Sequence, residues 1–338
     1  MDEILTQHLK QLCADRSRAY EILRETADPA VSHEAGLLVD LILGEELSLA
    51  APMWPGVDAV TALPPQQGVA AVRAWRATVA AAQPNRKGMT AALTAFPAWL
   101  ERLDDTTREM FFDALPKLAP ALDVFGEAGI TELISAAKAC RVAEARTALE
   151  FAATYCQTTP EIAAAALHLA VLACTTGSTG VLSELAKHLP FERIEASRQA
   201  ERLLPALDRA CAACGESAAE ALALLTQIAE SDLASALNTA HGLPKALAHI
   251  APEERAAALE IMRKLVGAMG IRVIGFCLHK LPELYASKGQ AHAGRVAEVA
   301  CAAAERYGVL AGEAVLEGRT EIARQLLSGD AMTSRHTS

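Results

Sequence analysis

A short proline-containing phrase recurs along this sequence, and the distance between its copies limits the folds open to the chain. In each copy an apolar residue precedes proline and a leucine follows closely. The three best copies are Leu204-Pro205-Ala206-Leu207, Leu243-Pro244-Lys245-Ala246-Leu247 and Leu281-Pro282-Glu283-Leu284. Their prolines are 39 and 38 residues apart. A polar turn and then an amphipathic stretch follow each copy. The spacing predicts successive helix pairs, because one pair cannot bury its apolar face alone and a stacked neighbour completes the core.

The composition supports helices throughout. Alanine accounts for 72 of the 338 residues, whereas aromatic residues are only 4% of the chain. Alanine is the best helix former, is depleted in strands, and lets helices approach closely. The hydrophobic fraction of 52% excludes a disordered chain. We therefore predict an all-α protein that resembles HEAT and armadillo proteins, an α-solenoid of degenerate helical pairs of about 38–40 residues.

One break in composition divides the predicted organisation. The segment 51–68 holds four prolines and two glycines, which is typical of a loop or linker. The expected parts are an N-terminal helical cap at 1–50, the Pro/Gly-rich linker at 51–68, a helical-repeat body at 69–328 and a disordered tail at 329–338. Helices are expected, among other places, at 31–49, 68–82 and 313–327.

The charge and the cysteines restrict partners and location. The formal net charge is −10, with no block rich in lysine and arginine, so we expect no nucleic-acid partner. Eight cysteines lie mostly singly in apolar helical patterns, and the N-terminus lacks the basic start and apolar core of a signal peptide. Both features predict a reducing cytoplasm.

The uncharged stretch 162–183 is interrupted by TTGSTG, which favours a buried helix and a turn over a membrane span.

The candidate metal and redox motif is Cys211-Ala-Ala-Cys214. A structural zinc site needs four ligands, and neither a second CxxC nor a close histidine pair or HExxH motif is present. We interpret Cys211 and Cys214 as two small residues one helical turn apart. We accordingly expect no metal, no cofactor and no catalytic residue, and we predict that the protein is not an enzyme.

Other patterns have structural explanations. Asp104-Asp105 lacks the third carboxylate of an aspartate-rich metal motif and instead predicts acidic groups at a helix start. The segment Thr176–Gly180 lacks the lysine of a phosphate loop and predicts a turn. Gly270 is expected to end a helix. His168, in an apolar run, is expected in the core, as are two tryptophans at helical spacing, Trp75 and Trp99.

Two candidate functional sites remain open. Trp54 lies in the proline-rich segment, where a tryptophan need not belong to the helical core. It either docks on its own chain or contacts a protein partner. The alternative is a small-ligand pocket, or an enzyme's active site, near His241, Cys277 and His279. His241 and His279 occupy equivalent positions in consecutive copies of the phrase, which favours packing or capping over catalysis.

The phrases RLLPAL, HGLPKAL and HKLPEL, with the helices predicted after them, give residues 200–327 a family resemblance. This region resembles the helical part of NorD/CbbO-type proteins, which are von Willebrand A-domain partners of MoxR-class AAA+ ATPases. The chain has no DxSxS motif, so the metal site of an A domain is missing. The resemblance implies a helical adaptor that recruits an AAA+ ATPase or its client, and no functional residue is carried over. The expected function is a non-enzymatic scaffold or adaptor that binds another protein.

Overall fold

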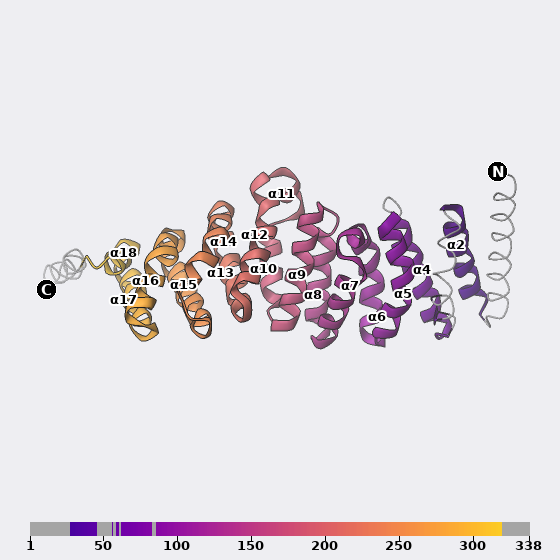
Figure 1. The fold of residues 1–338 in the computed structure, drawn as a ribbon, viewed down its shortest axis with the longest axis horizontal. Coiled ribbons are helices and arrows are strands. Elements are labelled where there is room, and N and C mark those ends of the chain that lie inside the picture. The colour runs from indigo at the N-terminus through magenta and orange to yellow at the C-terminus, as the bar shows by residue number, and fades with distance from the viewer. Residues whose placement is uncertain (1–27, 46–55, 57–58, 61, 83–85, 320–338) are drawn as a thin grey trace, which may run out of the picture. The chain divides into compact units, whose positions relative to one another are not determined.

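The computed structural model describes residues 28–45, 56, 59–60, 62–82 and 86–319. The described residues are 90% helical and none of them lies in a strand, which confirms the all-α prediction. The chain divides between residues 179 and 180 into two compact units. Figure 1 labels the helices of both units. Trp54, most of the predicted linker and the predicted tail at 329–338 lie outside the described residues.

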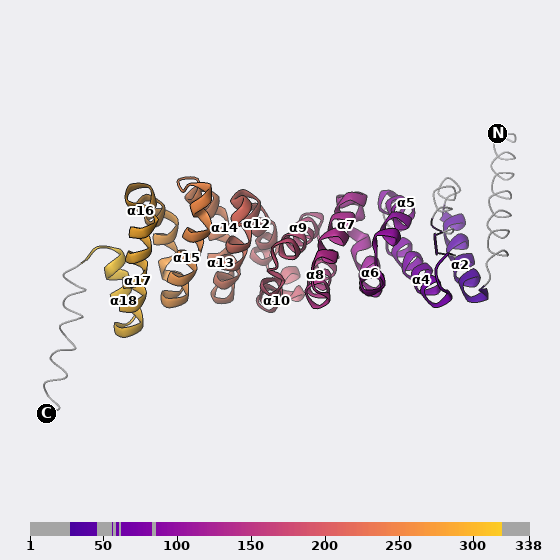
Figure 2. The same cartoon turned by 90° about the horizontal axis from the view of Figure 1, so that it is seen from below.

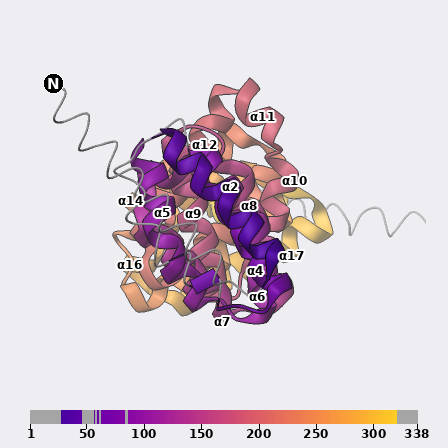
Figure 3. The same ribbon diagram turned by 90° about the vertical axis from the view of Figure 1, so that its right-hand side faces the viewer.

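The first unit is a series of helices joined by short connections. Its described elements are α2 (Pro29–Glu45), α4 (Pro65–Ala82), α5 (Arg86–Arg102), α6 (Asp105–Leu118), the 3₁₀ turn η2 (Ala119–Ala121), α7 (Leu122–Ala139), α8 (Val142–Tyr155) and α9 (Pro160–Thr176). Helices α4, α6 and α8 pack in one layer, and α5, α7 and α9 pack in a second layer. Seen end-on, α4, α6 and α8 lie to one side of α5 and α9, and α2 covers α4 (Figure 3).

The second unit repeats this alternation. Its described elements are α10 (Thr179–His188), α11 (Phe191–Ala196), α12 (Arg198–Cys214), η3 (Gly215–Ser217), α13 (Ala218–Ser231), α14 (Leu233–Leu247), η4 (Pro252–Glu254), α15 (Arg255–Met269), η5 (Gly270–Val273), the π-helical turn η6 (Phe276–Lys280), α16 (Leu281–Lys288), α17 (Gln290–Tyr307) and α18 (Val309–Leu316). Helix α14 packs between α12 and η6, while α15 packs between α13 and α17 (Figure 2). The helices are thus packed as sequential pairs.

Local sequence explains where several helices begin and end. The Asp104 carboxylate caps α6 by accepting a hydrogen bond from the Thr107 N–H at 2.9 Å, so the capping interpretation is confirmed. Gly177 ends α9 in the left-handed conformation, with φ of 68°, and Gly270 ends α15 with φ of 70°. Both predicted helix ends are confirmed, because glycine adopts positive φ without a steric penalty.

The core consists mainly of leucine and alanine with a few aromatic anchors. Trp75 and Trp99 are fully buried, as predicted, and Trp75 stacks on Phe96 with ring centroids 4.9 Å apart. His168 is a correction: it lies on the exposed side of α9, not in the core. The less buried side of this helix is also apolar, with Ala164, Val171 and Leu172 half-buried, so the apolar pattern alone does not show which side is buried.

Helix boundaries differ from the predictions at two places. Helix α4 starts at Pro65 instead of residue 68, because proline is well suited to the first turn, where no N–H is needed. Near the C-terminus, the structure has a break at Gly308 and a short helix α18 that ends at Leu316, whereas the sequence favoured a helix from 313. Gly308 has φ of 92° and separates α17 from α18.

The contact between α2 and α4 includes a buried carboxylate. Glu34 is buried on α2, and its oxygens lie 2.7 Å from Arg73 Nε and 3.2 Å from Arg76 Nη2 of α4. The hydrogen bond from Arg73 lowers the pKa of Glu34. The ionised form is therefore favoured in the folded protein, and its contribution to stability is full above the ordinary pKa of a glutamate.

We expect Glu34→Gln to lower the free energy of unfolding by about 1 kcal/mol at pH 7, since both arginines lose a charged partner and Arg73 is largely exposed. The difference from the wild type should shrink below about pH 4.5 and disappear once the wild-type carboxylate is protonated. Urea denaturation at several pH values measures it. Glu101→Gln, at an exposed position of α5, is the control, and an equal effect of both substitutions would contradict the assignment.

A pair of helical glycines tests the close packing of the second unit. A Cβ placed on Gly312 would lie 2.5 Å from Met269 Sδ and 2.8 Å from the Ala300 carbonyl oxygen, whereas one on Gly294 would meet only Ile261 Cδ1 at 3.9 Å. We expect Gly312→Ala to destabilise the protein by about 1–3 kcal/mol and Gly294→Ala to stabilise it by up to about 1 kcal/mol. Thermal unfolding followed by circular dichroism checks both signs, and stabilisation by Gly312→Ala would refute the tight packing.

Candidate functional site

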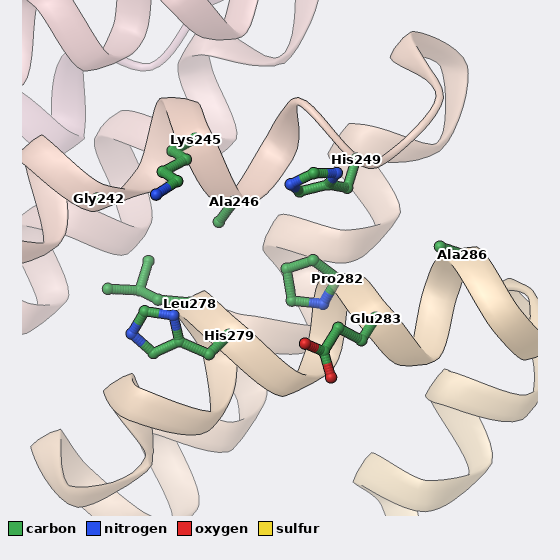
Figure 4. A pocket seen from close by; sticks show the side chains of 9 residues that line it. All are labelled: Gly242, Lys245, Ala246, His249, Leu278, His279, Pro282, Glu283 and Ala286. Atoms are coloured by element: carbon green, nitrogen blue, oxygen red, sulfur yellow. The ribbon is translucent and has the colours of Figure 1, made fainter.

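The candidate site is an open groove between α14 and the η6–α16 segment, with a volume of about 330 Å³ (Figure 4). We call it the α14/α16 groove. Helix α14 contributes Gly242, Lys245, Ala246 and His249, which follows its last turn. The second side comes from Leu278, His279, Pro282, Glu283 and Ala286. The lining thus combines small or apolar residues with four polar side chains.

Helix α14 presents this surface because its opposite face is buried. Asp232 caps the helix by accepting the Ser235 N–H at 2.7 Å, and this bonding lowers the pKa of Asp232. Leu237, Leu243 and Leu247 face the core. The side chains of the groove therefore fall on the remaining face, toward η6 and α16.

Proline accounts for the irregular backbone on the other side of the groove. Pro282 has no N–H and its ring disfavours a regular helix before it. The chain forms the π-helical turn η6 just before this residue, with the Leu281 N–H bonded to the Phe276 carbonyl. The turn places Leu278 close to α14, where a Cβ on Gly242 would lie only 3.1 Å from Leu278 Cδ1. The absence of a side chain at Gly242 therefore allows the two elements to approach.

The predicted pocket residues are only partly brought together. His279 lines the groove, but Cys277 is buried behind it, and burial raises the pKa of its thiol to about 12. His241 is exposed and adjoins Gly242 without being among the lining residues. Lys245, His249 and Glu283 are the polar residues that sequence reasoning missed. The spacing of His241 and Lys245 by four residues was the available signal, since it places both on one face of α14; His249 follows the end of the helix.

Similar grooves lie between other pairs of helices in the same layer. One of about 490 Å³, the α15/α17 groove, has small residues on both helices, Gly267 and Ala268 on one and Gly294 and Ala297 on the other. In the first unit, grooves of about 120 Å³ and 530 Å³ lie between α6 and α8 and between α5 and α7. All four are open furrows between helices that are neighbours in a layer.

The cysteines of the CxxC motif are packed in the core. Cys211 and Cys214 are both buried on α12, and burial raises the pKa of the Cys214 thiol to about 11 and that of Cys211 further. The structural interpretation of this motif agrees with these positions. Among the described residues, no group of three or more His, Cys, Asp or Glu side chains is arranged to hold a metal ion.

Helix α9 contains most of the uncharged stretch 162–183, for which the sequence favours a buried helix over a membrane span. Within the described ranges, no helix combines the length and apolar character needed to cross a membrane. Helix α9 instead packs against α7 and α8 in the first unit.

Comparison with known proteins gives no relative: the sequence matches no family model, and no curated protein or solved structure matches the chain.

The burial of the thiols predicts their reactivity. In a Cys13→Ser background, which removes a thiol outside the described residues, we expect DTNB at pH 8 to react with the two partly exposed cysteines, Cys140 and Cys301. Five cysteines should react only after denaturation, because they are inaccessible and burial raises their pKa: Cys156, Cys174, Cys211, Cys214 and Cys277. Mass spectrometry of the labelled peptides assigns the sites. Rapid labelling of Cys211 or Cys214 in the folded protein would contradict a purely structural role.

Proposed function

We propose that this protein is a non-enzymatic scaffold or adaptor that binds another protein on a surface built from HEAT/armadillo-like helical repeats. The observation that carries the proposal is the recurrence of open grooves between same-layer helices in both units. An open groove accepts a continuous segment of a partner chain, whereas a small ligand is usually bound in a cleft that buries most of its surface.

The grooves have the chemical character that segment binding needs. Their floors are small or apolar, as with Ala246 and Pro282 in the α14/α16 groove, and their edges carry charged side chains such as Lys245 and Glu283. Apolar floors supply the contact area, and charged edges select among partners. The packing of sequential helix pairs supports the solenoid proposed here, because stacked pairs produce such a furrow wherever two helices of one layer meet.

The resemblance of residues 200–327 to the helical region of NorD/CbbO-type proteins makes a MoxR-class AAA+ ATPase, or its client, the first partner to test. The free thiols of the described cysteines fit a reducing compartment. The proposal accordingly places the adaptor in the cytoplasm, with no nucleic-acid or membrane partner.

A second candidate function is binding of a small ligand in the α14/α16 groove. The observation in its favour is that two imidazoles, His249 and His279, line the groove with Lys245 and Glu283. Ligand binding and partner binding at the same groove give different outcomes in the experiment below.

The experiment is site-specific photocrosslinking in host cells. A photoreactive phenylalanine analogue replaces Lys245 or His279 in the α14/α16 groove, or Lys264 in the α15/α17 groove. The matched control replaces Gln199, which is exposed on α12 and lines none of the four grooves. We expect a discrete protein crosslinked from a groove position and not from Gln199. That protein, once purified, should bind the unmodified chain, with affinity at least about tenfold weaker for a groove variant.

Failure of every groove position to exceed the Gln199 control, with all variants folded, would overturn the adaptor proposal. A cellular small molecule that copurifies with the protein and occupies the groove, detected by mass spectrometry, would instead favour the ligand-binding function.

A further inference from the structure

We propose that the α14/α16 groove binds an acidic segment of the partner protein. This inference rests on the adaptor function proposed above and specifies the chemistry of its occupant. The argument starts from the polar groups around the groove, continues with its floor, and then compares it with the other large groove of the same unit.

Hydrogen-bond donors dominate the edges of the groove. Lys245 supplies an ammonium, and His249 and His279 supply imidazole N–H groups, whereas Glu283 is the one acidic residue of the lining. Carboxylates only accept hydrogen bonds and form their strongest ones with charged donors. The edges therefore offer a partner's Asp or Glu side chains three donor groups from two elements (Figure 4).

The basic character continues beyond the lining residues. His241 is exposed one turn before Lys245 on α14, and Lys280 is exposed next to His279. His241 and Lys245 lie one turn apart on α14, and His249 follows just after the helix ends, so that basic side chains recur along this edge of the groove. Such an edge matches a segment with several acidic residues better than it matches a single small anion.

The floor of the groove admits a chain close to the backbone. Gly242 and Ala246 on α14 face Pro282 and Ala286 on α16, so that bulky side chains do not fill the middle of the furrow. Leu278 adds an apolar contact at one end. The expected occupant is thus amphipathic, with apolar side chains toward the floor and carboxylates toward both edges.

The neighbouring groove in the same unit has more acidic than basic residues in its lining. The α15/α17 groove has one basic residue, Lys264, and two acidic ones, Glu298 and Glu305. The whole chain carries a formal charge of −10. Within the second unit, the excess of donors is therefore found at the α14/α16 groove and not at the α15/α17 groove. The α5/α7 groove of the first unit also has more basic than acidic residues, but threonines line it where the α14/α16 groove has glycine, alanine and proline.

Fluorescence anisotropy tests the inference on the full-length protein. The probe is a fluorescein-labelled 15-residue peptide with leucine and glutamate at helical spacing, compared with the same peptide in which every glutamate is glutamine or lysine. We expect binding of the glutamate peptide at least about tenfold tighter than that of either other peptide, and weakening as sodium chloride is raised. Equal binding of the glutamate and glutamine peptides, or no binding of the glutamate peptide, would overturn the inference.

Matched charge reversals locate the binding. Lys245→Glu should weaken binding of the glutamate peptide at least about tenfold, and Lys245→Ala should weaken it less. Lys264→Glu makes the same change of charge in the α15/α17 groove and should alter binding by less than about twofold. Circular dichroism confirms that the variants are folded. Equal losses from Lys264→Glu and from Lys245→Glu would show attraction by net charge alone and would refute a specific site.

The crosslinking experiment separates the two proposals. A partner that crosslinks at His279 through a basic or uncharged segment would leave the adaptor function in place and overturn the acidic occupant. Selective crosslinking of RNA at this position would overturn both.

Discussion

Close approach between helices through small side chains is the constraint on which the rest of the structure depends. Alanine fills much of the buried surface in both units, and the contact of α18 with α17 leaves no room for a Cβ on Gly312. At such short separations each additional atom displaces a neighbour, so packing decides stability residue by residue. Several of the few large side chains, Trp75 and Trp99 among them, are fully buried anchors within the first unit.

Prolines within helices give these layers their irregularities. Pro205 and Pro244 lie inside α12 and α14, and Pro282 follows the π-helical turn η6 at the start of α16. Each removes a backbone donor from its helix, and the surrounding packing tolerates the loss. At Pro282 the consequence extends to the α14/α16 groove, since η6 carries Leu278 and His279 into its lining. The feature that revealed the helix pairs in the sequence thus shapes the surface on which binding is proposed.

Grooves, rather than an enclosed cavity, are what sequential pairs of helices produce at their surface. The floors of the α14/α16 and α15/α17 grooves are similar, because glycine and alanine line both. Their edges differ, as the donors around Lys245 and the carboxylates near Lys264 illustrate. If the adaptor proposal holds, the exposed edge residues select the partner, because they can be substituted without disturbing the core.

The sequence alone determined that the chain is helical and where several helices end. Glycine at positions such as Gly177 and an aspartate cap at Asp104 act through local backbone geometry, so they can be predicted without the rest of the fold. It also gave one residue of the groove, His279.

Only the tertiary structure decided which side of each helix is exposed and which residues meet across a groove. Alanine is compatible with both environments, which is why His168 was misplaced. Lys245 and Glu283 were missed because their neighbourhood depends on the register of α14 against η6 and α16. That register is set by packing between segments more than 30 residues apart, such as the close contact of Gly242 with Leu278.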